Sequence, residues 1–119
     1  MIARVHPGET PSSYVVQGLI EFLAIANHPI AKLLRENVVF KIIPMLNPDG
    51  AYLGNNRVNL LGHDLNRYWN NISFYTHPTL SATMDMLKEY DTSEVCTKIN
   101  LFSDLLIFFL LVLSTRLYY

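Results

Sequence analysis

The sequence has almost no cysteine and almost no excess of charge. Cys96 is the single cysteine, so no disulfide can form within the chain. That usage fits a reducing compartment and argues against a small secreted scaffold. Nine basic residues against ten acidic ones leave a formal net charge of −1. We therefore expect neither a nucleic-acid-binding surface nor a polybasic membrane patch.

The sequence also shows no pattern typical of a secretory signal or of a membrane-spanning helix. The first residues show no basic stretch followed by an apolar one, so we expect no secretory signal and a cytosolic chain. The apolar run Leu105–Leu113 is too short to cross a bilayer, which takes about 20 apolar residues. A buried helix or an exposed sticky tail is a better interpretation of this segment than an anchor, and we expect no membrane partner.

The apolar spacing predicts two helices followed by a strand. Thr10 and Pro11 form a helix start, and apolar residues at helical intervals predict a helix over Pro11–Ala26. Pro29 then opens a second short helix to about Arg35. The β-branched run Val38–Ile43 is typical of a strand buried on both faces.

The second part of the chain begins with a segment that has no sustained period. Asn47–Asn71 is rich in Asn, Gly and Asp, which predicts a long irregular loop of the kind that often carries function. Within it, Asn47-Pro-Asp-Gly50 is most simply a turn. A helix follows from Pro78 to about Tyr90. This order predicts a single α/β domain, with residues 1–95 as its body and 96–119 as a divergent apolar tail.

Two residues near the amino terminus have the chemistry of metal ligands. His6 and Glu9 are separated by Pro-Gly, and a histidine and a carboxylate at this spacing can face one divalent ion. A hydrolytic zinc site needs a third protein ligand and an open position for water. The alternative is structural: His6 packs near the helix start while Glu9 complements the helix dipole.

Three residues downstream suggest a peptidase when taken with this pair. Arg57 is suited to stabilising the oxyanion that forms when water attacks a peptide carbonyl. Asn66 and Arg67 offer an amide and a guanidinium fork, which suit the terminal carboxylate of an exopeptidase substrate. Asp64 is placed to hold Arg67 or a metal ligand. For either arginine taken alone, ordinary surface pairing is the better interpretation.

Together these motifs resemble a known family. His6-Pro-Gly-Glu9, the stretch from Phe40 to Gly50, Gly54-Asn-Asn-Arg57 and Asp64-Leu-Asn-Arg67 are similar to zinc carboxypeptidases. The resemblance runs from about Ala3 to Leu80. It is closest to the cytosolic carboxypeptidases that trim glutamates from tubulin, and within them to the type 6 branch.

The resemblance implies a fold, a cofactor and roles for five residues. The fold is a partial mixed sheet with flanking helices, and the cofactor is Zn²⁺. His6 and Glu9 would be zinc ligands, Arg57 the oxyanion-stabilising residue, and Asn66 with Arg67 the carboxylate grip. The implied partners are glutamate-rich protein tails such as those of tubulin.

The chain also departs from that family's pattern. The family has a third zinc ligand, a histidine, after the last predicted helix, and a glutamate base further on. No histidine follows His77 in this sequence. His28, His63 and His77 are poor substitutes, because each precedes a loop or a helix start. We therefore expect a truncated chain with weak or no peptidase activity, or a non-catalytic module that binds glutamate tails.

Overall fold

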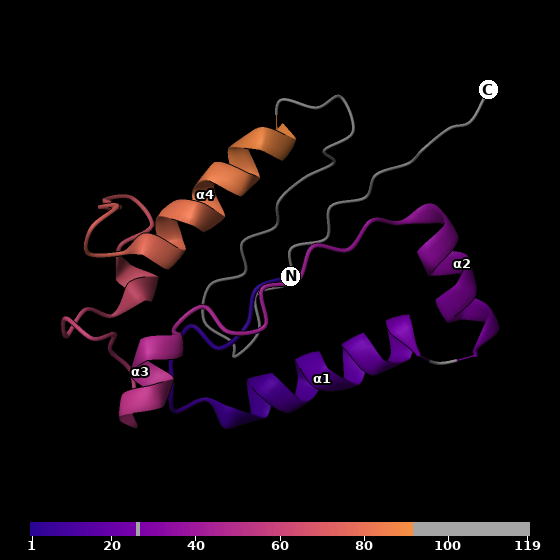
Figure 1. Cartoon of the computed structure of the whole chain (residues 1–119), viewed down its shortest axis with the longest axis horizontal. Coiled ribbons are helices and arrows are strands. Elements are labelled where there is room, and N and C mark those ends of the chain that lie inside the picture. Colours follow the sequence, from indigo (N-terminus) through magenta and orange to yellow (C-terminus); the bar gives the residue numbers. More distant parts are fainter. Residues whose placement is uncertain (26, 92–119) are drawn as a thin grey trace.

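The computed structural model describes residues 1–25 and 27–91, and the apolar tail predicted over 96–119 lies outside them. Four α-helices and one short 3₁₀ helix occur in this part of the chain (Figure 1). They are α1 (Thr10–Ala24), α2 (Pro29–Asn37), α3 (Pro48–Leu53), η1 (Leu65–Arg67) and α4 (Pro78–Asp91). No helix among the described residues has the length and apolar character needed to cross a membrane.

The three predicted helices are all present, with small differences at their ends. Helix α1 begins at Thr10, and Glu9 is its N-cap residue, one position before the predicted cap. Its C-cap is Ile25, whose N–H donates to the Glu21 carbonyl. In α2 the His28 side chain caps the helix by accepting from the Ile30 N–H at 3.2 Å. Proline at each helix start, with its fixed φ and missing N–H, explains why these beginnings were predictable.

The strand predicted over Val38–Ile43 is not formed among the described residues. A single parallel bridge joins Ile2 to Ile43, and the backbone bonds around it link residues 1–4 to residues 41–47. Val39, nearer the start of the run, is 45% exposed, so the segment is not buried on both faces as predicted. The reason is the lack of a neighbour: residues 38–40 have no partner strand in the described part of the chain, and a β-branched run needs one.

The loop predicted over Asn47–Asn71 contains two helices. Helix α3 begins where a turn was predicted, because the Asn47 side chain caps it by accepting from the Gly50 N–H at 3.0 Å. Gly54 ends it in the left-handed conformation at φ 74°, which a glycine adopts without steric cost. The rest of the segment, apart from η1, is irregular as predicted.

The amino-terminal segment separates two apolar clusters. Ile2 and Val5 belong to a cluster with Leu46, Leu65 and Leu80. Met1 and Ala3 belong to a second cluster with Val16 of α1. Ile43 packs on the first cluster and Ile42 on the second, so neighbouring residues face opposite ways. This alternation is the one that a strand covered on both faces shows.

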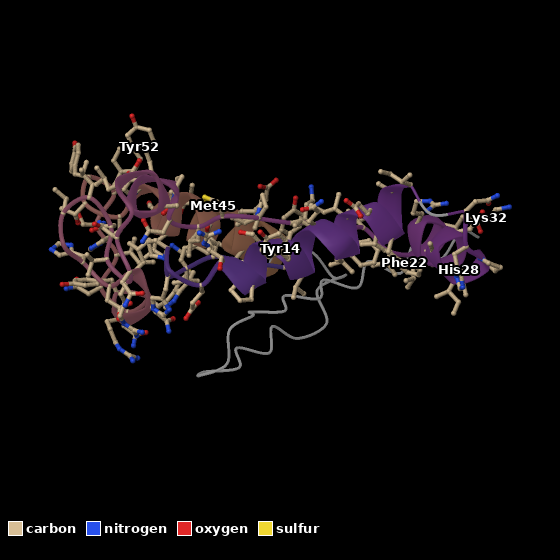
Figure 2. The ribbon with its side chains drawn as sticks, turned by 90° about the horizontal axis from the view of Figure 1, so that it is seen from below. Tyr14, Phe22, His28, Lys32, Met45 and Tyr52 are labelled. Atoms are coloured by element: carbon tan, nitrogen blue, oxygen red, sulfur yellow. The ribbon has the colours of Figure 1, made fainter. Side chains whose placement is uncertain are left out.

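The arrangement brings the start of α1 close to α3 and the segment that follows it. Figure 1 shows these parts at one end of the molecule, with α2 at the other. There α2 lies beside the end of α1, and Arg35 donates to the Leu23 carbonyl at 2.6 Å. Figure 2 shows Phe22 and His28 at this second end. Their ring centroids are 5.6 Å apart.

Candidate metal and carboxylate site

The candidate site is built on the turn that precedes α1. The Glu9 N–H donates to the His6 carbonyl at 3.1 Å, and the Ser12 hydroxyl donates to the Glu9 carbonyl at 2.7 Å. These bonds connect the turn to the first residues of the helix. They place the His6 and Glu9 side chains on the same side, with His6 Nδ1 and Glu9 Oε1 2.9 Å apart.

The turn is packed directly against the loop that carries Arg57. The Gly8 N–H donates to the Asn56 carbonyl at 2.8 Å. A Cβ on Gly8 would lie 2.3 Å from Asn56 Oδ1 and 2.8 Å from its carbonyl oxygen, so a larger residue does not fit. The Asn55 amide shapes the same loop by donating to the Val58 and Asn59 carbonyls. Close approach of two backbones is what requires the glycine here.

Asp64 joins the residues of the site. Its Oδ1 accepts from His6 Nε2 at 3.1 Å, across 58 residues of sequence, and its Oδ2 accepts from Arg57 Nε at 2.7 Å. Arg67 Nε lies further away, 3.9 Å from Oδ2. The Asp64 side chain also caps η1 by accepting from the Asn66 N–H. His6, Arg57 and Arg67 thus lie around the Asp64 carboxylate with the backbone of Asn66, and Glu9 is connected to them through its contact with His6.

The charge of Asp64 is stabilised where it lies. Burial alone raises the pKa of its carboxyl, because the side chain is only 18% exposed. Hydrogen bonds from Arg57, the Asn66 N–H and His6 outweigh that effect, so the pKa lies below its ordinary value. Asp64 is therefore ionised at neutral pH and holds an imidazole and a guanidinium in fixed positions.

The donor set of His6 and Glu9 fits a zinc ion in part. Two ligands of a tetrahedral zinc ion at about 2.0–2.2 Å lie roughly 3.3 Å from one another. His6 Nδ1 and Glu9 Oε1 therefore need to separate by only about half an ångström from their present 2.9 Å. The other ring nitrogen of His6 bonds a carboxylate, as the second nitrogen of metal-bound histidines usually does.

A third ligand does not join this pair in the described part of the chain. No group of three or more His, Cys, Asp or Glu side chains gathers there in a way that suits a metal. The histidines judged to be poor substitutes lie elsewhere: His28 caps α2, while His63 Nδ1 and His77 Nε2 contact each other at 2.9 Å.

The side chains that would bind a carboxylate differ in their exposure to solvent and in their existing hydrogen bonds. Arg57 is 47% exposed at its side chain and Arg67 is 64% exposed. Asn66 Oδ1 accepts from Trp69 Nε1 at 3.2 Å, which orients the Asn66 amide. Two guanidinium groups and an oriented amide on one surface suit an anionic ligand.

Sequence reasoning missed two features of this region. The first is the network of Asn59, His63 and His77, in which Asn59 Oδ1 accepts from the His63 N–H and Asn59 Nδ2 donates to the Thr76 carbonyl. The second is Arg4, which bonds the Pro7 carbonyl and the Ser13 hydroxyl. Neither lies in a recognisable motif, although the two histidines in an irregular, polar segment were a signal for the first.

Comparison with known proteins is consistent with this geometry. The sequence profile of the zinc carboxypeptidase family matches residues 1–105. A mouse protein named Cytosolic carboxypeptidase 6 is 61% identical over 84 residues, which is 71% of this chain and 15% of the mouse protein. The Caenorhabditis elegans protein of the same name is 53% identical over 93 residues, or 78% of this chain and 20% of that protein. The chain thus spans less than a quarter of these relatives.

Solved structures of carboxypeptidases are also similar to this chain. A metallo-carboxypeptidase from Burkholderia cenocepacia superimposes with a TM-score of 0.70 and 39% identity, covering 74% of this chain and 24% of that one. A putative carboxypeptidase A from Shewanella denitrificans gives a TM-score of 0.71 at 36% identity, covering 74% and 23%. The described residues therefore have a carboxypeptidase-like fold over most of their length.

Proposed function

The chain belongs to the zinc carboxypeptidase family, and on that premise we propose that it carries part of a zinc-dependent carboxypeptidase site for glutamate-rich substrates. The proposed bonds are those to C-terminal or side-chain glutamates of protein tails such as those of tubulin. The observation that supports it best is the Asp64 carboxylate, which holds His6 on one oxygen and Arg57 on the other. The relatives are named cytosolic carboxypeptidases, and we propose the same compartment for this chain.

Each residue of the site has a proposed role in the chemistry. His6 and Glu9 would hold the zinc ion, which when bound supplies Lewis acidity and an activated water. Arg57, fixed by Asp64, would stabilise the negative charge that develops on the carbonyl oxygen during attack. Asn66 and Arg67 would bind the free carboxylate of the substrate and so set the position of the scissile bond.

The fold and the level of activity are part of the same proposal. Residues 1–3 and 41–46 would form neighbouring strands of a mixed sheet once further strands complete it, as the alternation of Ile42 and Ile43 suggests. With two zinc ligands among the described residues, we propose weak metal binding and weak or absent turnover. The segments 1–95 and 96–119 would be the catalytic part and a divergent tail.

A second candidate function follows from the exposed guanidinium groups. Arg57 and Arg67 are 47% and 64% exposed, and both lie beside Asp64 on a surface that needs no metal to attract an anionic tail. A module that binds glutamate tails without cutting them is therefore the alternative. Arg67→Ala would weaken its binding to a polyglutamate peptide, while Lys32→Ala, a change at an exposed ion pair of α2, would not.

Zinc content tests the first proposal. We expect the purified full chain to bind zinc weakly and to reach a 1:1 ratio only at saturating concentrations of buffered free metal. His6→Ala and Glu9→Ala should abolish this binding, whereas His28→Ala, a matched change at the exposed N-cap of α2, should not. Metal uptake that survives both ligand variants would contradict the proposed site. Peptide binding without zinc uptake would favour the module instead.

A further inference from the structure

We infer that Arg4 is a positioning residue for the proposed metal-binding turn, acting through the Pro7 peptide that lies between His6 and Glu9. This inference rests on the proposed function of those two residues. The Arg4 guanidinium donates from Nε to the Pro7 carbonyl at 2.7 Å and from Nη1 to the Ser13 hydroxyl at 2.7 Å. It therefore links the turn to the first turn of α1.

The peptide unit that joins Pro7 to Gly8 is held at both of its polar groups. Its N–H, that of Gly8, donates to the Asn56 carbonyl at 2.8 Å, and its carbonyl, that of Pro7, accepts from Arg4. The next N–H, that of Glu9, donates to the His6 carbonyl within the turn. Rotation of the Pro7 peptide would move the Glu9 carboxylate relative to the imidazole. A charged donor on this carbonyl resists that rotation, because charge-assisted hydrogen bonds are the stronger ones.

The backbone conformation of Arg4 is unusual and is held by hydrogen bonds to the carbonyls of Ala3 and Arg4. Its φ is 51°, and it is the one non-glycine residue with positive φ in the described part of the chain. The Leu46 N–H donates to the Ala3 carbonyl, and the Asn47 N–H donates to the Arg4 carbonyl at 3.2 Å. These are the last backbone bonds between the amino-terminal segment and residues 43–47, and the turn begins directly after them. Such conformations persist only where the surroundings fix them.

A glycine would adopt this backbone more easily, which allows the two roles of Arg4 to be separated. Arg4→Gly removes the guanidinium and relieves the backbone at the same time. If the side chain acts only by stabilising the fold, the relief of strain should partly compensate and the turn should keep its geometry. If the side chain positions the turn, the turn should loosen although the backbone is relaxed.

The experiment compares wild type, Arg4→Gly, Arg4→Lys and Ser13→Ala in the full chain. Zinc affinity is measured by competition with a chromophoric chelator, and amide exchange is measured without metal. We expect Arg4→Gly to weaken zinc binding roughly 10–100-fold, the usual effect of losing a residue that orients a metal ligand. The Gly8 and Glu9 amides should exchange at least about tenfold faster, relative to the amides of α4, by the same loss of restraint.

The two remaining variants give graded controls. Arg4→Lys keeps the charge but offers a point donor in place of a planar fork, so it should rescue only part of the affinity. Ser13→Ala removes the α1 acceptor and leaves the Pro7 contact, so it should have the smallest effect. Full rescue by lysine would show that charge alone is required and would overturn the positioning role.

The two readouts also separate this inference from the proposed function. If wild type binds no zinc, the proposed function fails, and amide exchange alone then decides the role of Arg4. If Arg4→Gly leaves both zinc affinity and the relative protection of Gly8 and Glu9 unchanged, the inference is wrong whether or not zinc binds. Faster exchange throughout the chain, α4 included, would show a structural role only and would also overturn it.

Discussion

At the scale of single residues, Asp64 determines the geometry of the site. The carboxylate has two acceptor oxygens, and each holds a different cationic or polar group: His6 on Oδ1 and Arg57 on Oδ2. One residue thus fixes the relative positions of a proposed metal ligand and a proposed oxyanion donor. Because the His6 contact spans 58 residues of sequence, it also connects the amino-terminal turn to the segment around η1.

The change Asp64→Asn tests this role. Asparagine has nearly the same shape but no charge, so both contacts weaken and Arg57 loses its counter-ion. We expect the free energy of unfolding to fall by about 1–2 kcal/mol, at the lower end of the range for charged hydrogen bonds because Arg57 is half exposed. Zinc affinity should fall roughly 10–100-fold. Urea unfolding and chelator competition measure the two effects.

The matched control for that change is Asp85→Asn. Asp85 lies on α4, is 71% exposed and is 3.9 Å from Lys88, so its replacement should change stability by less than about 0.5 kcal/mol. Equal losses for the two variants would show that Asp64 has no special role.

Two glycines provide a second test at this scale. Gly8→Ala places a methyl group 2.3 Å from Asn56 Oδ1, and we expect a loss of about 1–3 kcal/mol because the Arg57 loop must move away from the turn. Gly18→Ala lies in α1 with nothing within 4 Å of the new methyl group, and should gain about 0.5–1 kcal/mol. Thermal or urea unfolding compares the two variants, and a Gly8→Ala variant as stable as wild type would contradict the close packing of Gly8 against Asn56.

At the scale of elements, the segment between η1 and α4 is held by a directed chain of hydrogen bonds. The Ser73 N–H can only donate, so His77 Nδ1 must accept from it. In neutral His77 the proton then lies on Nε2, which donates to His63 Nδ1 at 2.9 Å. Tyr68 stacks on His63 with ring centroids 4.8 Å apart. Protonation of either imidazole would disrupt this chain.

This network predicts how stability depends on pH. Burial, together with the nearby His63 imidazole, lowers the pKa of His77. A group whose pKa is lowered by folding contributes stability above its unfolded value, and that contribution is lost as the pH falls through the folded pKa. We therefore expect stability to decrease as the pH drops below about 6.5, the ordinary value for histidine. Urea unfolding at a series of pH values measures the slope.

Variants show which histidine produces that slope. His77→Gln should be less stable at every pH but should lose most of the slope below about pH 6.5. His28→Gln, at the exposed N-cap of α2, should retain it. Asp64, whose pKa is lowered, adds its own loss only at more acidic pH, so the two windows are distinct. An unchanged slope in His77→Gln would contradict the prediction.

The elements also show which parts of the fold the sequence could predict. Helices α1, α2 and α4 begin at or next to a proline and have apolar residues at helical spacing, so local chemistry defines them. Helix α3 has six residues, too few for a period, and its start signal, Asn47-Pro48, is equally typical of a turn. The strand predicted over Val38–Ile43 is present only as a single bridge at Ile43 among the described residues, because pairing depends on a neighbour, which local composition does not reveal.

In the candidate site, too, the sequence predicted the contact that depends on local spacing but not the contacts that depend on tertiary packing. The proximity of His6 and Glu9 follows from a spacing of three residues, and the structure has them 2.9 Å apart. The contact of Asp64 with His6 depends on tertiary packing, and the sequence suggested it only as one of two roles for Asp64. The role of Arg4 depends on a backbone conformation that no side-chain pattern indicates.

At the scale of the whole molecule, the described residues leave much apolar surface uncovered. An apolar groove of about 460 Å³ lies between α1 and residues 44–45, lined by side chains that include Val16, Ile20 and Met45. A small core with an open apolar face implies modest stability.

This surface should bind an apolar dye in the native state. We expect the full chain to enhance ANS fluorescence at neutral pH without denaturant, because the groove offers a contiguous apolar site. Ile20→Gln, which places an amide in the groove, should reduce the enhancement by about half or more. Tyr52→Gln is the control, since Tyr52 is 91% exposed, projects outward from α3 (Figure 2) and is not among the residues that line the groove. Equal dye binding by wild type and Ile20→Gln would show that another part of the chain covers the groove.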